Sequence, residues 1–310
     1  MILRNLGRSG LRVSLVGLGC NNFGQRMDLE SSRLVIHKAL DAGITLFDTA
    51  DVYGGRGGSE TVLGQVLGDR RKDIVLASKF GMAMDEGEKV GASRRYIIAA
   101  CEASLKRLKT DWVDLYQQHR PDPLTPAEET LRALDDLVRQ GKVRYIGHSN
   151  FSPAQTTEAQ WAARHFNLNS FVSAQDEYSL LKRDIEMEAL GVYQRYGLGV
   201  LPYYPLASGL LTGKHKRGGA AAGTRLAMPM FSAFMSDKNF DIVEKLEAFV
   251  KARGRTMLEL AFSWLAARPP VASIIAGATR PEQIEANVNA ASWELSAEEM
   301  KEIDEITHAG

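Results

Sequence analysis

Apolar residues follow two different spacings that take turns along the chain. Short, mostly apolar runs are typical of buried strands, and they alternate with longer segments in which apolar residues recur every three or four positions, as on one face of a helix. Residues 93–108 show the helical spacing, with Ile97, Cys101, Leu105 and Leu108 on one side. The sequence therefore predicts alternating strands and helices over most of its length.

These elements group into eight strand-then-helix units. We expect strands at residues 16–19, 44–47, 74–77, 112–116, 143–147, 171–175, 199–202 and 271–275. We expect helices at residues 34–41, 59–67, 93–108, 184–193, 238–252, 257–267 and 281–291, with a short one after Ser296. Two further helices should begin at capping boxes, with Thr125 and Ser152 as the N-caps, each followed by Pro and then by Glu or Gln.

Alternating units of this kind imply parallel strands with right-handed crossovers. Eight units in 310 residues favour a closed (β/α)8 TIM barrel. An open dinucleotide-binding sheet is the alternative, and it needs a G-x-G-x-x-G turn after the first strand. Gly17 and Gly19 begin that turn, but Asn22 stands where its third glycine belongs. We therefore predict one barrel domain over residues 1–310.

Two segments fall outside this alternation. Residues 1–15 predict a β-hairpin around a turn at residues 7–10, ahead of the first barrel strand. Residues 209–235 are rich in Gly, Ala and Met and have no clear period. Long irregular loops in compact domains are commonly functional lids, so we expect this segment to cover a bound ligand.

Composition limits the classes of partner and the cellular compartment that are expected for this chain. The chain has 38 basic and 38 acidic residues, and this balance provides no field that favours nucleic acid or an anionic membrane. Its two cysteines, Cys20 and Cys101, form no CxxC pair and no zinc-ligand spacing. No signal peptide and no long apolar run is visible. A reducing, cytoplasmic setting is expected.

Polar residues stand at the ends of successive predicted strands. The carboxyl ends of barrel strands meet at one mouth, where active sites form. Asp48, Lys79 and His119 end the second, third and fourth strands, and Tyr53 follows Asp48 closely. Further polar residues end the next three strands: Ser149, Asn150, Gln175, Tyr203 and Tyr204.

Asp48, Tyr53, Lys79 and His119 suit proton transfer to a carbonyl oxygen. A tyrosine with its ordinary pKa of about 10 is a poor acid or base at neutral pH. A nearby ammonium lowers that pKa, and a carboxylate keeps the lysine charged and in place. Asp51, in the same stretch, is assigned to loop hydration or to a structural pairing.

Several stretches, in this order and spacing, resemble those of aldo-keto reductases along nearly the whole chain. They are residues 43–53, Gly58-Ser59-Glu60 with Leu63-Gly64, Ser78-Lys79, residues 114–119, residues 147–151, Gln175, residues 204–214 and residues 277–287. The resemblance implies a metal-free enzyme that reduces a small carbonyl substrate with a nicotinamide cofactor. Tyr53 would be the general acid/base, Lys79 and Asp48 would tune it, and His119 would orient the carbonyl.

The resemblance also implies the residues that bind the cofactor. Ser149, Asn150 and Gln175 match those that hold the carboxamide, and Tyr203 matches the aromatic that stacks on the nicotinamide. The expected contacts are Gly19, Cys20, Asn21, Asp48, Ser149, Asn150, Gln175, Tyr203, Tyr204, Pro205, Leu206, Ser208, Gly209, Leu211, Lys214, Arg225, Gly277, Thr279, Arg280, Gln283 and Asn287.

NADPH is the expected cofactor, with NADH as the alternative. Arg280 beside a helix start suits a 2′-phosphate, because the helix N-terminus exposes N–H groups and arginine is a forked donor. The chain departs from much of the family nearby, with Gly277, Gln283 and Ala286 where many members carry Lys, Arg and Glu. At the first strand end, Cys20-Asn21 replaces a Thr-Trp pair and should reshape one wall of the substrate pocket.

Three other functions stay open at this point. Potassium-channel β subunits share the four catalytic residues, so a cofactor-sensing regulatory subunit is one. The chain begins only a few residues before the hairpin, without the N-terminal extension that a gating subunit is expected to use. A Schiff-base aldolase with Lys79 as nucleophile is the second. A metal-dependent barrel hydrolase is disfavoured because no His-x-His follows the first strand.

Overall fold

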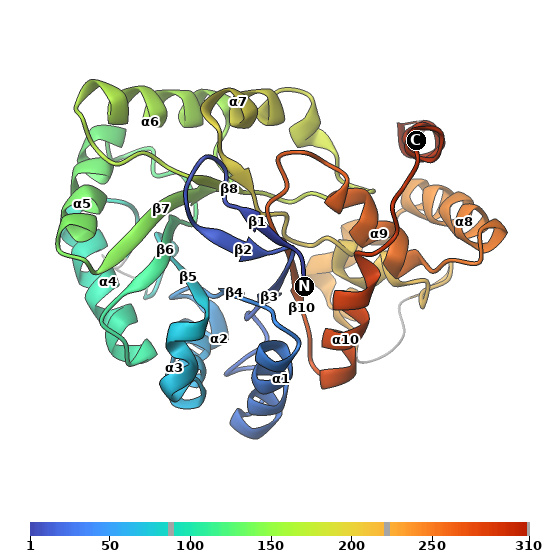
Figure 1. Ribbon diagram of the computed structural model, residues 1–310, viewed down its shortest axis with the longest axis horizontal. Coiled ribbons are helices and arrows are strands. Elements are labelled where there is room, and N and C mark those ends of the chain that lie inside the picture. Colours follow the sequence, from blue (N-terminus) through green and yellow to red (C-terminus); the bar gives the residue numbers. More distant parts are fainter. Residues whose placement is uncertain (86–89, 220–223, 309–310) are drawn as a thin grey trace.

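The computed structural model describes residues 1–85, 90–219 and 224–308 (Figure 1). Eight parallel strands form the central sheet: β3 (Val16–Gly19), β4 (Leu46–Asp48), β5 (Val75–Phe80), β6 (Val113–Gln118), β7 (Val143–Ser149), β8 (Ser173–Gln175), β9 (Gly199–Val200) and β10 (Ile274–Gly277). Their order in the sheet is β10-β3-β4-β5-β6-β7-β8-β9. Backbone bonds from Ala272 N to Val200 O (2.9 Å) and from Ile275 N to Pro202 O (3.0 Å) join the two ends. The predicted (β/α)8 barrel is therefore confirmed.

Helices surround the strands (Figure 1). The α-helices are α1 (Leu29–Asp41), α2 (Tyr53–Arg56), α3 (Gly58–Val66), α4 (Arg94–Leu108), α5 (Ala127–Arg139), α6 (Pro153–His165), α7 (Ala189–Tyr196), α8 (Asp237–Ala252), α9 (Met257–Ala266), α10 (Pro281–Ala290) and α11 (Ala297–His308). Five 3₁₀ helices are described: η1 (Gly68–Asp73), η2 (Asp184–Glu186), η3 (Ala207–Thr212), η4 (Arg225–Ala227) and η5 (Pro229–Met235). In the part of the chain that the structure describes, no helix is long and apolar enough to cross a membrane.

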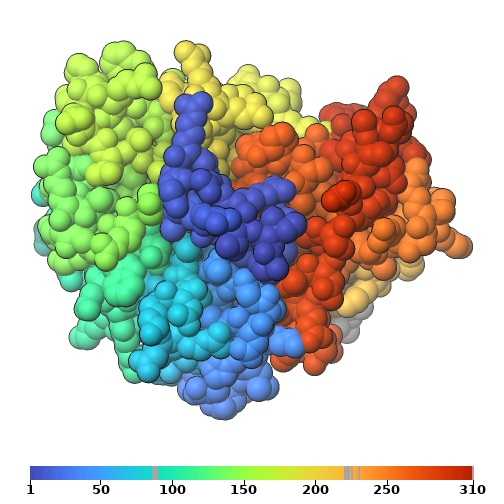
Figure 2. Space-filling view, in the orientation of Figure 1, coloured from blue at the N-terminus to red at the C-terminus, as the bar shows by residue number. Residues whose placement is uncertain are grey.

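The N-terminal hairpin closes the amino end of the barrel. Strands β1 (Leu3–Asn5) and β2 (Arg12–Ser14) pair antiparallel, and Figure 2 shows them lying across the centre of that face. Gly7 at their turn has a φ of 58°, and a Cβ there would lie 2.2 Å from Gly197 O. Both the left-handed backbone conformation and the lack of room for a Cβ require glycine at this position. Arg4 ties the hairpin to the barrel by donating to the carbonyls of Val271 and Ala266, each at 2.8 Å.

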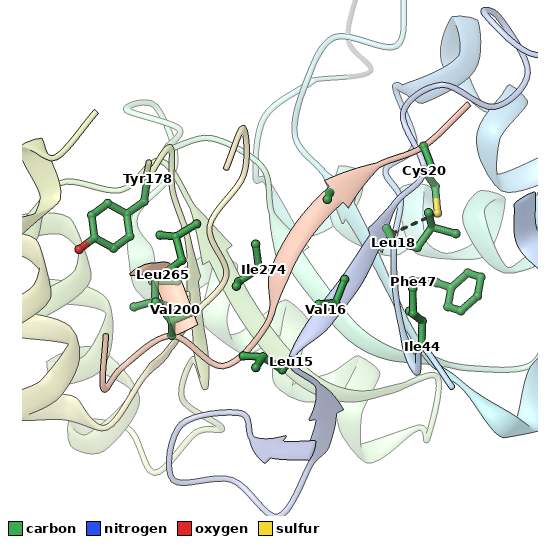
Figure 3. Packing of buried hydrophobic residues seen from close by; sticks show 14 of the residues in the cluster. Leu15, Val16, Leu18, Cys20, Ile44, Phe47, Tyr178, Val200, Leu265 and Ile274 are labelled. Carbon is green, nitrogen blue, oxygen red and sulfur yellow. Dashed lines mark hydrogen bonds between the residues drawn. The ribbon is translucent and has the colours of Figure 1, made fainter. Parts of the chain in front are cut away.

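Two apolar clusters hold the barrel together. The smaller one includes Leu6 of the hairpin together with Leu46, Val75 and Leu115 of the strands. The larger one lies between the sheet and the surrounding helices, and Figure 3 shows part of it. Both faces of the parallel sheet are therefore covered, as its nearly continuous apolar strands require.

Three local predictions are wrong. The helix predicted from residue 34 begins at Leu29, because Asp28 caps it by accepting from Ser31 N at 2.8 Å. Thr125 caps no helix: helix α5 begins at Ala127, and Thr125 Oγ1 instead donates to Asp122 at 2.7 Å. The helix predicted at residues 184–193 is split into η2 and α7.

Two predictions at other element starts have different outcomes. The strand predicted from residue 271 begins at Ile274, since Val271 makes only an isolated bridge with Val200. The capping box at Ser152 is confirmed, because Ser152 and Gln155 exchange both of its hydrogen bonds.

Candidate active site

Three side chains from neighbouring strands and one from a turn come together at the carboxyl end of the barrel. Asp48 ends β4, and its Oδ2 lies 2.6 Å from the Nζ of Lys79 on β5. Lys79 Nζ also donates to Thr49 O at 3.0 Å and to Tyr53 OH at 3.5 Å. The ring of His119, just after β6, meets the Tyr53 ring edge-on with centroids 5.6 Å apart. The four predicted catalytic residues are thus neighbours.

A glycine turn delivers Tyr53 to this position. Tyr53 opens α2, and the two residues after it, Gly54 and Gly55, have left-handed φ values of 69° and 75°. A Cβ on Gly54 would lie 2.4 Å from both Phe23 O and Ser59 N. The backbone therefore turns sharply after the tyrosine and packs against the β3–α1 loop, which leaves the phenol beside Lys79.

Burial and neighbouring charges set the protonation states. Burial alone would lower the pKa of Lys79, but Asp48 and Tyr53 outweigh it and the pKa is raised, so the ammonium is kept. Burial raises the pKa of Tyr53, and the opposing effect of Lys79 is smaller. The pKa of Tyr53 therefore rises, although the lysine alone was expected to lower it, and the phenol keeps its proton.

His119 is a neutral imidazole at physiological pH. Burial, then the charges of Lys79 and Arg120, lower its pKa to about 2. Its Nδ1 is buried and has no hydrogen-bond partner among the described residues. A neutral ring of this kind can orient a substrate oxygen without adding another positive charge beside Lys79.

A shell of amides fixes Asp48. Its Oδ1 accepts from Gln175 Nε2 at 2.9 Å and from Gln117 Nε2 at 3.3 Å, so both carboxylate oxygens have donors. Gln117 carried no signal that singled it out in the sequence, since it lies inside β6 rather than after it. The carboxylate is held at one angle by three strands, which in turn holds Lys79.

The predicted carboxamide-binding residues form a second chain of contacts. Asn150 has a φ of 62° and donates through Nδ2 to His119 O at 3.0 Å and to Ser149 Oγ at 2.9 Å. Its Oδ1 accepts from Tyr203 OH at 2.8 Å. Since a carbonyl oxygen has two lone pairs, Asn150 Oδ1 can accept one further bond from a ligand amide.

A cavity of about 720 Å³ opens over these residues. It is lined by most of the predicted site: Gly19, Cys20, Asn21, Asp48, Tyr53, His119, Ser149, Asn150, Gln175, Tyr203, Tyr204, Pro205, Leu206, Ser208, Gly209, Lys214, Gly277, Thr279, Arg280 and Gln283. Lys79 and Leu211 are fully buried behind the wall, and Asn287 is 5% exposed on α10 without lining it. Arg225 belongs to η4, and its side chain lies outside the described part of the structure.

Some residues that line the cavity were not predicted from the sequence. The additional lining residues are Asn22, Arg26, Val52, Met82, Arg120, Thr212, His215, Thr224, Ile275 and Ala276. Several are direct neighbours of predicted residues, such as Arg120 after His119, and adjacency could have found them. Arg26 and Met82 carried no such signal, because loops after the first and third strands fold back over the mouth.

The cavity wall also carries the donors that an anionic cofactor needs. Ser208 Oγ is buried and has no hydrogen-bond partner in the described chain, although it lies on the cavity wall. Lys214 and Arg280 line the same cavity. Arg280 is the N-cap of α10, with Pro281 behind it. At Gly277 an added Cβ would lie 3.2 Å from Asn22 Nδ2, so its glycine leaves room for close approach. These residues fit a phosphate-bearing dinucleotide.

Gln283 occupies the N–H groups at this helix start. Its Oε1 accepts from Thr279 N at 2.7 Å and from Arg280 N at 3.3 Å. These N–H groups are therefore paired within the chain, and a phosphate at this end would meet the guanidinium of Arg280 or displace the Gln283 amide.

Comparisons with known proteins agree with this geometry. A model described as "Aldo/keto reductase family" matches residues 15–308. A "Probable voltage-gated potassium channel subunit beta" from Oryza sativa subsp. japonica is 38% identical over 299 residues, covering 94% of this chain and 91% of its own. An "L-glyceraldehyde 3-phosphate reductase" from Escherichia coli (strain K12) is 35% identical over 325 residues, covering 98% and 92%. An "Uncharacterized oxidoreductase YrpG" from Bacillus subtilis (strain 168) is 37% identical over 312 residues, covering 97% and 94%. The chain therefore belongs to the aldo/keto reductase family.

Proposed function

We propose that this protein reduces a small aldehyde or ketone to the alcohol with NADPH, and that the reaction is reversible. The observation that carries the proposal is the row of Asp48, Lys79 and Tyr53, with 2.6 Å between the first two and 3.5 Å between the last two, in which Asp48 and Lys79 are buried and Tyr53 lines the large cavity. The name of the Escherichia coli relative supports a carbonyl substrate.

Each of the four residues has one task in this reaction. NADPH, when bound, supplies the hydride for the carbonyl carbon. Tyr53 donates its phenolic proton to the carbonyl oxygen, and Lys79 stabilises the phenolate that this leaves, at 3.5 Å. Asp48 keeps Lys79 charged and fixed. His119, neutral beside the Tyr53 ring, orients the oxygen. The raised pKa of Tyr53 supplies a protonated acid at the start of reduction.

The charge distribution around the cavity favours NADPH over NADH. The only carboxyl side chain among the described lining residues is that of Asp48, and it is already paired with Lys79. We assign the phosphate contacts to Lys214 and Arg280, which line the cavity, and to Arg225 of η4. Arg280 is the residue that we assign to the 2′-phosphate.

Tyr53→Phe tests the mechanism. NADPH oxidation with a reactive small aldehyde should fall by about 10²–10⁴-fold, the usual contribution of a positioned general acid. NADPH binding, followed by quenching of protein fluorescence, should stay within about two-fold, because no cofactor contact is assigned to the phenol. Reduction that continues undiminished in Tyr53→Phe would refute the assigned role.

A regulatory role is the second candidate, and the relatives named as channel β subunits favour it. In that case the protein would bind NADPH tightly while showing no turnover across a panel of aldehydes and ketones, and it would co-purify with a membrane channel. Turnover of any panel member that disappears in Tyr53→Phe would favour the reductase.

A further inference from the structure

A second buried carboxyl lies two residues before Tyr53. Asp51 is 1% exposed and does not line the cavity. Its Oδ1 has no hydrogen-bond partner among the described residues. Its Oδ2 accepts from Tyr96 OH at 3.4 Å, a long and therefore weak bond. Of the two roles considered from the sequence, hydration in a loop is excluded by this burial.

Arg107, a cation whose charge acts on Asp51, forms its ion pair with another acid. Glu60 of α3 is 0% exposed, and its Oε2 lies 2.7 Å from Arg107 Nε on α4. Its other oxygen, Oε1, accepts from Ser78 Oγ at 2.5 Å. Two buried carboxyls therefore lie near one guanidinium, and its ion pair is with Glu60. Because an uncompensated buried charge is costly, Asp51 is the member of the pair that keeps a proton.

The backbone connects Asp51 to the catalytic residues on both sides. Asp51 N donates to the carbonyl of Lys79 at 3.1 Å. Tyr53 N donates to Ala50 O at 3.2 Å, and Lys79 Nζ donates to Thr49 O at 3.0 Å. The turn that carries Tyr53 is therefore hydrogen-bonded to β5, and the Asp51 side chain is the part of this turn that lies in the protein interior. Because Asp51 and Tyr53 share the turn, a displacement of Asp51 is expected to change the position of the phenol relative to Lys79.

We propose that Asp51 is a positioning residue for Tyr53 and acts only while its carboxyl is protonated, so that turnover falls when Asp51 ionises. This inference rests on the proposed reductase function. An ionised Asp51 would be a second buried anion beside Glu60, and the turn would have to open to hydrate it. Asp51 touches neither substrate nor cofactor and acts through Tyr53 alone.

The charged and titratable groups around Asp51 determine the pH at which its carboxyl ionises. They are Glu60 of α3, Tyr96 and Arg107 of α4, Lys79 of β5 and Tyr116 of β6. Burial and then the negative charge of Glu60 raise the pKa of Asp51 to about 7, against smaller opposing effects of the Val52 N–H, Arg107 and Tyr96. The neutral form therefore predominates below about pH 7 and is lost as the pH rises through that value.

The test is the pH profile of kcat with saturating NADPH and a small aldehyde. The wild type should lose activity on the alkaline side with an apparent pKa of about 7. In Asp51→Asn the amide keeps the shape and cannot ionise, so this loss should be absent while KM and the NADPH Kd change less than two-fold. Asp176→Asn is a matched control, because Asp176 is also a buried acid, with a pKa raised by burial to about 6. It should leave the alkaline loss in place.

A third variant changes the neighbour instead of Asp51 itself. Glu60→Gln removes the nearby negative charge and releases Arg107, so the alkaline loss should move to lower pH. The inference is overturned if Asp51→Asn keeps the wild-type profile, or if it is inactive at every pH while still binding NADPH. Absence of aldehyde reduction by the wild type at every pH would instead refute the proposed function.

Discussion

The Asp48–Lys79 pair should be strongly coupled in stability as well as in catalysis. Its atoms are 2.6 Å apart, and the two side chains are 4% and 0% exposed. Removing one partner of such a buried pair leaves an uncompensated charge and typically costs about 3–5 kcal/mol. Lys79→Met would leave Asp48 with only the Gln117 and Gln175 amides, and Asp48→Asn would leave Lys79 with Thr49 O and Tyr53.

The double variant should be far milder than the two single variants together. Asp48→Asn/Lys79→Met removes both charges and keeps similar volumes, so it should destabilise by about 2 kcal/mol or less. The resulting coupling energy is then about 4 kcal/mol or more if each single change costs about 3 kcal/mol. All four proteins would be compared by urea unfolding, followed by circular dichroism at pH 7.

Activity cannot replace this measurement, because every variant in the cycle removes a residue assigned to catalysis. The unfolding slopes of the four proteins should agree, since none of the changes alters the surface exposed on unfolding. If the costs of the two single changes add up to that of the double change within about 0.5 kcal/mol, the pair is not coupled and the reasoning is wrong.

Two further predictions concern the cofactor and the hairpin. Arg280→Gln should weaken NADPH binding about 10-fold or more, the value of one charge-assisted hydrogen bond, and leave NADH binding within about two-fold; equal losses measured by fluorescence titration would contradict the 2′-phosphate assignment. Gly7→Ala should lower the midpoint of thermal unfolding more than Gly68→Ala, since both have left-handed φ values, 58° and 48°, but only at Gly7 would the new Cβ meet backbone atoms. Equal midpoints for the two variants would show that the hairpin accommodates the added Cβ without loss of stability, which would contradict the prediction.

The sequence determined the architecture and indicated the position of the candidate site. Alternating strand and helix spacings imply parallel strands, and parallel strands bring their carboxyl ends to one mouth. Asp48, Lys79 and His119 could be placed together on that ground alone, before any contact was known. Helix caps were less predictable: Ser152 forms its capping box, whereas the Thr125 hydroxyl donates to Asp122 and caps no helix. The side chain of a capping motif can bond to any tertiary partner within reach instead of capping its helix.

Only the tertiary structure decided the protonation states and the partners behind the wall. From the sequence, Lys79 is expected to lower the pKa of Tyr53, but packing of the folded chain around the phenol outweighs the lysine, and the pKa rises. Asp51 resembles any acid in a glycine-rich turn until α3 and α4 enclose it and Arg107 bonds to Glu60. Burial and electrostatics depend on residues that are far apart in the chain. The sequence therefore indicates the candidate residues, and the packing of distant elements determines the charge that each one carries.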